Sequence, residues 1–152
     1  MPQCETKYFE SLNYEPGSEI EFPAGLPGFE NCRWFLPLDD TARNPVLFLQ
    51  SLEQPGLCFI MLPVLAIDPT YQLTLTEEDL SALALDATRQ PVIGQGVLCF
   101  AVVAFGADGV PTANLLAPVV ISLKNGKAVQ QVRDDAVYGC RHPLSPEQSP
   151  CS

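Results

Sequence analysis

The stretch Asn114–Val132 (NLLAPVVISLKNGKAVQQV) constrains the fold most, because it predicts two β-strands that fold back on each other. Branched and bulky apolar residues lead up to Asn125-Gly126, a dipeptide that strongly favours the two positive-φ positions of a type I′ turn. A two-residue turn also determines which residues face each other across the strands. The predicted pairs are Lys124 with Lys127, Leu123 with Ala128, Ile121 with Gln130 and Val119 with Val132.

This pairing predicts one mainly apolar face and one polar face for the hairpin. The polar face carries Ser122, Lys124, Lys127 and Gln131. Two lysines opposite each other repel mildly, so we expect a solvated and mobile tip. Pro118 has no N–H to donate to a ladder, which predicts a strand start, an edge or a bulge there. A hairpin alone is marginal in water, so further strands must pack against it.

The composition favours short strands over long helices. A chain of 152 residues is long enough to bury about 70% of its unfolded surface as one domain. Its 15 prolines are about twice the usual share and divide it into short segments. The net charge of −10, with only eight Lys and Arg residues, disfavours direct nucleic-acid binding, because phosphate contacts need cations. Such acidity is compatible with a basic protein partner, and equally with plain solubility.

The sequence shows no secretory or membrane segment, so we expect a cytoplasmic protein. The first residues, MPQCETKYFE, have neither a basic start nor an apolar core. The longest apolar run, Leu57–Ile67, is interrupted by Pro63 and is far shorter than the ~20 residues of a spanning helix. In the cytoplasm the six cysteines should be reduced, and they contain no C-x-x-C pair that would indicate a zinc or redox site. Cys58 and Cys99 lie in apolar strands and are predicted to be small core residues.

Short segments predict the other strands of a small, barrel-like antiparallel domain. Ser18–Phe22 alternates polar and apolar residues as a half-buried strand does. Val97–Phe105 (VLCFAVVAF) is apolar on both faces and predicts a central strand that is buried on both sides. The remaining predicted strands are Cys4–Phe9, Arg33–Leu38, Val46–Ser51, Leu57–Leu62 and Tyr71–Leu75, with a turn at Glu53–Gly56.

One short helix is predicted at about Glu77–Leu85. Thr76 suits its N-cap, acidic residues occupy its first turn, and leucines follow at helical spacing. The fold class is therefore mostly β with one short helix. We expect a single domain over residues 1–144 and a disordered tail, rich in Ser and Pro, over residues 145–152.

Carboxylates dominate the region around this helix. Between Arg43 and Arg89 the sequence has no Lys or Arg. If the barrel brings the turn at Glu53 near the helix start, these carboxylates form one acidic face that attracts a basic partner. The alternative is a solvated surface with a capped helix. The carboxylates are Glu53, Asp68, Glu77, Glu78, Asp79 and Asp86.

The segment Pro23–Glu30 (PAGLPGFE) predicts a shaped loop, because it holds two Pro and two Gly in eight residues. Two interpretations are open. The loop either presents Leu26 and Phe29 to a partner, or forms a rigid connection in which both side chains fill the core.

Four segments resemble the flagellar assembly factor family in their order and spacing, and the match covers about residues 5–144. No single segment is decisive, but the four together are fairly specific. They are FPAGLPGFE (Phe22–Glu30), LQSLEQPGLCF (Leu49–Phe59), TANLLAPVVIS (Thr112–Ser122) and YGCRHPL (Tyr138–Leu144).

The resemblance implies a small barrel-like fold, no enzymatic activity and no cofactor. Members of the family bind flagellin and the RNA-binding protein carbon storage regulator A. It thus implies an antagonist of translational repression: after flagellin is exported, the freed factor binds the regulator, and flagellin messenger is translated. The candidate partner-binding residues are Leu26 and Phe29 for flagellin, and Glu53, Asp68, Glu77 and Glu78 for the regulator.

Two other classes of protein stay open. A small-ligand-binding barrel would need an apolar internal cavity, whereas the Leu- and Phe-rich strands favour a filled interior. An enzyme would need a pocket around Cys140 and His142, with Asp134 or Asp135 to orient the histidine. The alternative role for Arg141–Leu144 is structural, tying the last ordered segment onto the barrel. We therefore predict no catalytic, cofactor-binding or metal-binding residue.

Overall fold

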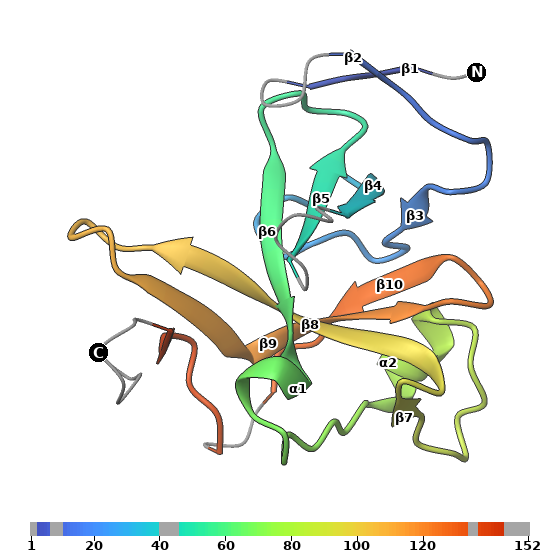
Figure 1. Ribbon diagram of the computed structural model, residues 1–152. Coiled ribbons are helices and arrows are strands. Elements are labelled where there is room, and N and C mark those ends of the chain that lie inside the picture. The colour runs from blue at the N-terminus through green and yellow to red at the C-terminus, as the bar shows by residue number, and fades with distance from the viewer. Residues whose placement is uncertain (1–2, 7–10, 40–45, 134–136, 145–152) are drawn as a thin grey trace.

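A closed ring of seven strands forms the centre of the protein (Figure 1). The computed structural model describes residues 3–6, 11–39, 46–133 and 137–144. Strand β9 pairs with both β8 and β10, and β10 meets β3 to close the ring. The mostly β, barrel-like fold is thus confirmed. The ring strands are β3 (Ile20–Glu21), β4 (Trp34–Asp39), β5 (Leu47–Ser51), β6 (Cys58–Pro63), β8 (Gly96–Phe105), β9 (Pro111–Ser122) and β10 (Lys127–Gln130).

Smaller elements surround the ring. Strands β1 and β2 form a separate two-stranded sheet, β7 pairs with β8, and β11 pairs with β9. The single-turn helix α1 follows β6 and was not predicted, and no helix in the described ranges is long and apolar enough to cross a membrane. The bounds are β1 (Gln3–Glu5), β2 (Ser11–Asn13), β7 (Val92–Ile93), β11 (His142–Pro143), α1 (Val64–Ile67) and α2 (Glu77–Ala82).

Two predictions at the ends of the chain extend beyond the described residues. Of the predicted strand Cys4–Phe9, the first part lies in β1, whereas residues 7–10 lie outside the described ranges. The predicted tail over 145–152 lies outside them entirely.

Helix α2 begins where the sequence predicts. The Thr76 hydroxyl accepts a hydrogen bond from the Asp79 N–H (3.1 Å), and the Asp79 carboxylate accepts one from the Thr76 N–H (3.1 Å). This reciprocal capping box satisfies two N–H groups that would otherwise lack partners at the helix start. Leu80 and Leu83 on the same helix are buried, so one face of α2 packs on the sheet.

The barrel strands bury side chains on two faces, which gives two hydrophobic cores. Alternate residues of β8 show the division, because Phe100 points into the ring and Cys99 and Ala101 point outward. The inner core comprises Ile20, Phe22, Leu26, Cys32, Phe35, Leu47, Leu49, Met61, Phe100, Val119, Ile121 and Ala128. The outer core comprises Val64, Tyr71, Leu75, Leu80, Leu83, Val97, Cys99, Ala101, Ala113, Leu115, Val120 and Val129.

The predicted hairpin forms, but its loop has four residues instead of two. Lys127 pairs with Ser122 and Ala128 pairs with Ile121, so the predicted pairing was wrong by two residues. Gly126 has a positive φ of 64°, whereas Asn125 does not, so the turn is not type I′.

Contacts of Asn125 with a distant part of the chain explain the longer loop. Its side-chain Nδ2 donates to the carbonyl oxygens of Leu83 (2.9 Å) and Ala84 (3.3 Å) at the end of α2. Lys127 does not face another lysine but forms an ion pair with Glu21 (2.8 Å), beside the point where β10 meets β3. The turn is thus tied to the body of the protein, and the predicted free, repulsive tip was wrong.

The predicted polar face of the hairpin is also buried. Ser122 and Gln131, which were assigned to solvent, are 0% and 5% exposed. The outer core covers this face, since Val120 and Val129 pack there with residues of α2 and of the Tyr71–Leu75 segment. Burial of both faces is typical of a strand that lies between two layers.

The Tyr71–Leu75 segment is not a strand, although its residues alternate. Its main-chain groups are paired by side chains instead of by a neighbouring strand. The Gln90 side chain donates to the Leu75 carbonyl and accepts from the Leu75 N–H (both 2.9 Å). Three other side chains complete the set: Tyr138 Oη accepts from the Gln72 N–H, Arg133 donates to the Gln72 carbonyl and Gln131 donates to the Thr74 carbonyl.

A bulge interrupts the ladder between β8 and β9, at the position of Pro118. The pair Phe100–Val119 is followed by Val102–Asn114, so the four residues 115–118 of β9 face the single residue Ala101 of β8. The predicted bulge at Pro118 is therefore confirmed. The bulge changes which alternate residues face inward, so Ala113 lies in the outer core whereas Val119 lies in the inner core.

We expect Ile121→Ala to lower the free energy of unfolding by about 2–5 kcal/mol, because Ile121 is 3% exposed and lies in the inner core. The matched control is Leu123→Ala, two residues away, which removes a side chain that is 58% exposed. It should change stability by no more than about 0.5 kcal/mol. Urea unfolding followed by circular dichroism measures both variants, and similar losses in the two would contradict the four-residue loop.

Candidate partner-binding groove

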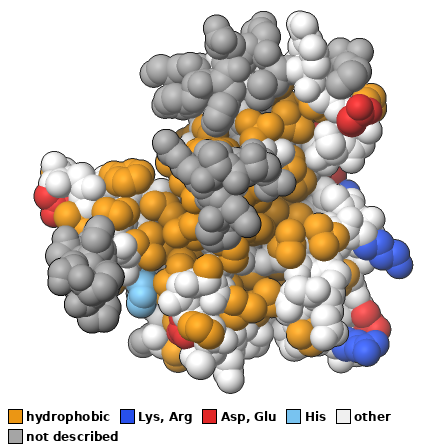
Figure 2. Space-filling view, in the orientation of Figure 1, with side chains coloured by type: hydrophobic (Ala, Val, Ile, Leu, Met, Phe, Trp, Pro, Cys, Tyr) orange, Lys and Arg blue, Asp and Glu red, His pale blue; other side chains and the backbone are white. Residues whose placement is uncertain are grey.

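A groove of about 840 Å³ opens where the end of the β8–β9 hairpin leaves the barrel. The ladder between β6 and β8 stops at the pair Ile60–Val103, whereas β8 continues with β9 as far as the pair Phe105–Pro111. This projecting arm is visible in Figure 1. Hydrophobic side chains gather between the arm and the barrel, and most charged side chains in this view lie at the periphery (Figure 2).

The Pro23–Glu30 loop forms one wall of the groove. The Phe29 N–H donates to the Leu26 carbonyl (2.8 Å), and Gly28 has a φ of 85°, so residues 26–29 form a tight turn of type II. Gly25 is also required, because a Cβ there would lie 3.0 Å from the Cα of Glu30. The turn separates the two candidate residues: Leu26 is 3% exposed in the inner core, whereas Phe29 is 39% exposed.

A chain of aromatic rings connects Phe29 to the inner core. Its ring meets the edge of Phe59 at 5.7 Å, and Phe59 contacts Phe35 at 6.0 Å. Phe35 in turn packs against Phe22 at 5.2 Å, and both are fully buried. Phe29 therefore presents an aromatic surface whose position is fixed by packing.

The arm supplies the opposite wall. Val102 lies at its base and is partly buried against the inner core, whereas Phe105 near its tip is 60% exposed. Ala104 and Phe105 are also exposed where the sequence predicted burial on both sides, because β6 no longer covers β8 there. Asp108 Oδ1 accepts from the Val110 N–H (3.0 Å), which stabilises the turn between the two strands.

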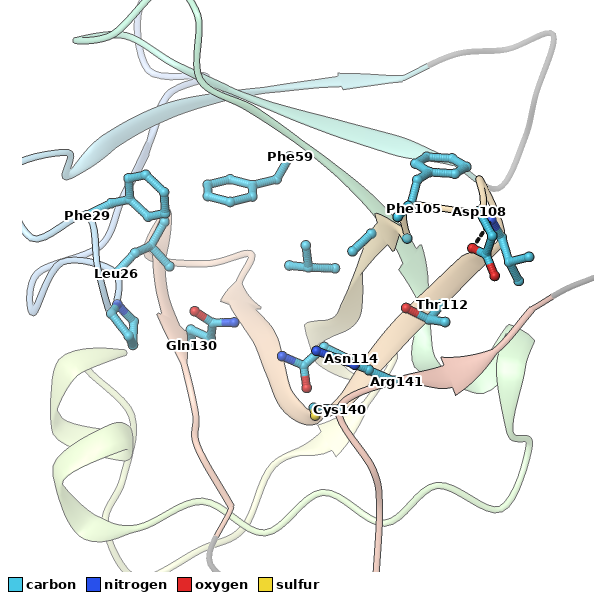
Figure 3. Close-up of a pocket in the computed structure, with 16 residues that line it drawn as sticks. Leu26, Phe29, Phe59, Phe105, Asp108, Thr112, Asn114, Gln130, Cys140 and Arg141 are labelled. Carbon is cyan, nitrogen blue, oxygen red and sulfur yellow. Dashed lines mark hydrogen bonds between the residues drawn. The ribbon is translucent and has the colours of Figure 1, made fainter.

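Two amide side chains lie on the floor of the groove (Figure 3). Asn114 Oδ1 accepts from the N–H groups of Leu116 (3.1 Å) and Ala117 (2.9 Å). Gln130 Nε2 donates to the carbonyl of Ala117 (3.0 Å). Both side chains thus bind main-chain groups that the bulge at Pro118 leaves without ladder partners.

The segment that ends in β11 lies along the groove and contributes Cys140 and Arg141. Strand β11 pairs with Ala113 and Thr112 of β9, and the Leu144 N–H donates to the Pro111 carbonyl (3.1 Å). The predicted structural tie of Arg141–Leu144 onto the barrel is therefore confirmed.

The geometry gives little support to an enzyme. Cys140 lines the groove, but His142 pairs with β9 and is not among the groove residues. Asp134 and Asp135 lie outside the described residues. Where the structure describes the chain, no three His, Cys, Asp or Glu side chains come together as a metal site would require. A ligand-binding barrel is also not supported, since large side chains of the inner core fill the ring.

The structure does not join the predicted acidic residues into one face. Glu53 lies in the β5–β6 turn, toward the opposite end of the molecule from α2 (Figure 1). Its carboxylate accepts from the N–H groups of Arg33 (2.9 Å) and Trp34 (3.0 Å), which is a structural role.

The carboxylates beside the helices are mostly engaged in local turns. Asp68 accepts from the hydroxyl (2.7 Å) and N–H (2.9 Å) of Thr70, and these bonds hold the pKa of its carboxyl below the usual value. Asp86 makes the same pair of bonds with Thr88, which likewise lowers its pKa. Both groups are exposed or half-exposed, so their contribution to stability is small.

Glu77 and Glu78 remain as the exposed carboxylates in the first turn of α2. Neither has a side-chain hydrogen bond or ion pair within the described part of the chain. Of the predicted acidic set, these two are the ones most available to a partner.

The groove is the place where four distant segments of the chain meet. Leu26 and Phe29 come from Phe22–Glu30, and Phe59 ends Leu49–Phe59. Thr112 and Asn114 come from Thr112–Ser122, and Cys140 and Arg141 come from Tyr138–Leu144. The four segments that resemble one family in the sequence thus each contribute to one surface.

Sequence reasoning missed most of this surface. It selected Phe29, but not Phe105, Asn114 or Gln130. The signal that could have found Asn114 is its place four residues before Pro118, since a bulge needs a nearby side chain to bind its free N–H groups. Phe105 gave no local signal, because its exposure depends on where β6 ends.

Comparisons with known proteins agree with the fold and the segments. A family model described as "FliW protein" matches residues 3–144. The chain is 30% identical over 148 residues to "Flagellar assembly factor FliW" of Thermoanaerobacter pseudethanolicus, covering 95% of this chain and 94% of that protein. It is 35% identical over 133 residues to the protein of the same name from Pseudothermotoga lettingae, covering 84% and 79%.

A solved structure shows the same fold. "Crystal structure of the flagellar assembly factor FliW" superimposes with a TM-score of 0.80 at 27% sequence identity, covering 97% of this chain and 99% of that one. Similarity of this extent shows that the strand order of the ring is shared.

We expect Cys140 to be the described cysteine that reacts first with a maleimide at pH 7. It is exposed in the groove, whereas Cys4, Cys32 and Cys99 are buried. Burial raises the pKa of the Cys99 thiol to about 12 and that of the half-buried Cys58 to about 11, so neither forms the reactive thiolate at neutral pH. Mass spectrometry of a Cys151→Ser variant identifies the labelled residue, and early labelling of Cys99 would contradict the assigned faces of β8.

Proposed function

Because the chain belongs to the FliW family of flagellar assembly factors, we propose that it binds flagellin through the groove and carbon storage regulator A through another surface. The convergence of the four segments on one groove carries this proposal. The protein acts in the cytoplasm, without catalysis or cofactor. While flagellin occupies the factor, the regulator represses translation; once flagellin is exported, the freed factor binds the regulator and flagellin messenger is translated.

The shape and chemistry of the groove support an apolar segment of flagellin as its occupant. Phe29 and Phe105 present exposed aromatic surface on opposite walls, with Phe59 between them and the barrel. Aromatic side chains held in place by packing are the usual sites of high binding energy in interfaces, because they lose little conformational entropy on binding. A flagellin segment with apolar residues on one side would bury both rings.

Leu26 supports the interface from behind. It is almost fully buried in the inner core, so it offers little surface of its own. Its carbonyl accepts the hydrogen bond that closes the turn and orients Phe29. Its role in this proposal is therefore to position Phe29.

We expect Phe29→Ala to weaken flagellin binding by about tenfold or more, because an exposed aromatic at an interface is worth about 1–3 kcal/mol. Titration calorimetry with purified monomeric flagellin measures the affinity. The matched control is Val92→Ala, which removes an apolar side chain that is 56% exposed in β7, away from the groove residues. Full flagellin affinity for a folded Phe29→Ala variant would remove this loop from the interface.

For the regulator, the first turn of α2 is the surface with the best support. An RNA-binding protein carries Lys and Arg to neutralise phosphates, so exposed carboxylates complement it. Glu77 and Glu78 are exposed and adjacent, whereas the other acidic candidates bind their own main chain. Exposed pairs of this kind contribute more to the rate of association than to affinity.

The double reversal Glu77→Lys with Glu78→Lys should slow association with carbon storage regulator A several-fold at low salt and flatten its salt dependence. Long-range attraction between exposed charges is screened beyond ~8 Å at physiological salt, which explains the dependence. Stopped-flow measurements at two salt concentrations give the rates, and flagellin affinity should change little.

The control for this reversal is Glu15→Lys, a charge change at another exposed glutamate, compared with Glu78→Lys alone. Equal association rates for wild type and the double reversal at both salt concentrations would exclude α2 as the contact.

A further inference from the structure

The two amides on the groove floor have orientations that their hydrogen bonds determine. Asn114 accepts from two N–H groups, so the atom that faces Leu116 and Ala117 must be its oxygen. Gln130 donates to the Ala117 carbonyl, so the atom that faces it must be its nitrogen. Since both side chains bind the main chain of Ala117, they are close neighbours.

The other end of each amide is left for a ligand. Asn114 Nδ2 has two N–H donors, and Gln130 Oε1 is an acceptor. Neither atom has a hydrogen-bond partner in the described part of the chain. Both residues are partly buried and line the groove, and Figure 3 shows them side by side on its floor. The floor therefore offers one donor and one acceptor next to each other, without a formal charge.

This combination selects a particular chemical group. A carboxylate or phosphate has only acceptors for hydrogen bonds and would meet the Gln130 oxygen unfavourably. An ammonium group has only donors and would meet the Asn114 N–H groups. A neutral amide, with one C=O and one N–H, satisfies both, and apolar walls on either side suit its neighbouring side chains.

We propose that Asn114 and Gln130 bind one main-chain peptide unit of the flagellin segment in the groove. The proposal rests on the function proposed above and adds how the segment is recognised. Main-chain groups within a helix are already bonded to each other and cannot bind the pair. The groove therefore selects a stretch of flagellin that is not helical where it crosses Asn114 and Gln130, and so distinguishes a chain that has not yet packed from one that has.

The variant Asn114→Asp tests the pair without removing its structural contacts. It keeps the oxygen that accepts from Leu116 and Ala117 and replaces only the donor that faces the groove. We expect an unchanged melting temperature and about tenfold weaker binding of purified monomeric flagellin by calorimetry. Gln95→Glu makes the same change of amide to carboxylate at an exposed loop position outside the groove, and it should bind as the wild type does.

Hydrogen–deuterium exchange of the complex identifies the bound amide. One flagellin main-chain N–H should exchange more slowly with the wild type than with Gln130→Leu, because Gln130 Oε1 is its acceptor. If Asn114→Asp loses affinity but no such N–H is found, the recognised amide belongs to an Asn or Gln side chain, and the main-chain proposal is overturned.

The outcomes separate the two levels of the proposal. If Phe29→Ala weakens flagellin binding and Asn114→Asp does not, the groove is correct and the amide pair is wrong. If flagellin does not bind the wild-type chain, the proposed function fails, and the pair loses its peptide ligand with it.

Discussion

The bulge around Pro118 is the constraint on which the rest of the structure depends. Proline has no N–H, so the ladder between β8 and β9 cannot run unbroken from the arm to the end of β9. Inserting four residues opposite Ala101 solves this and reverses the facing of β9, so the strand packs into the outer core before the bulge and into the inner core after it. One long strand can thereby belong both to a closed barrel and to a projecting arm.

The same bulge places fold and binding surface in the same residues. Its free main-chain groups are bound by Asn114 and Gln130, and by the carbonyl of Gly139, which accepts from the N–H groups of Leu115 (3.0 Å) and Leu116 (3.2 Å). Leaving such groups unbonded within a packed sheet would cost about 1–3 kcal/mol each. The side chains that remove this cost are also those that line the groove, so the floor is rigid before any partner arrives.

Local patterns predicted the elements well and their partners poorly. Thr76 and the acids after it define α2 because a capping box is a contact over three residues. The Asn125-Gly126 signal located the hairpin, but its register depends on Leu83 and Ala84, about forty residues away. Alternation in Tyr71–Leu75 indicated a strand, whereas Gln90, Gln131, Arg133 and Tyr138 supply the bonds a strand would have made. The groove was predicted only where the short loop itself turns Phe29 outward, since its other wall depends on tertiary packing.

The cluster of Tyr71, Arg133 and Tyr138 links the two sides of the sheet mechanically. The rings of Tyr71 and Tyr138 stack at 4.2 Å, and Arg133 lies over both. Tyr138 packs against the outer core, yet the residues two and three positions later, Cys140 and Arg141, form a wall of the groove. This segment is held by side-chain contacts and two ladder pairs, so it can open as a unit while the seven-stranded ring stays intact. The stiffness of the binding wall is therefore set on the far side of the barrel, by a stack of two tyrosines and an arginine.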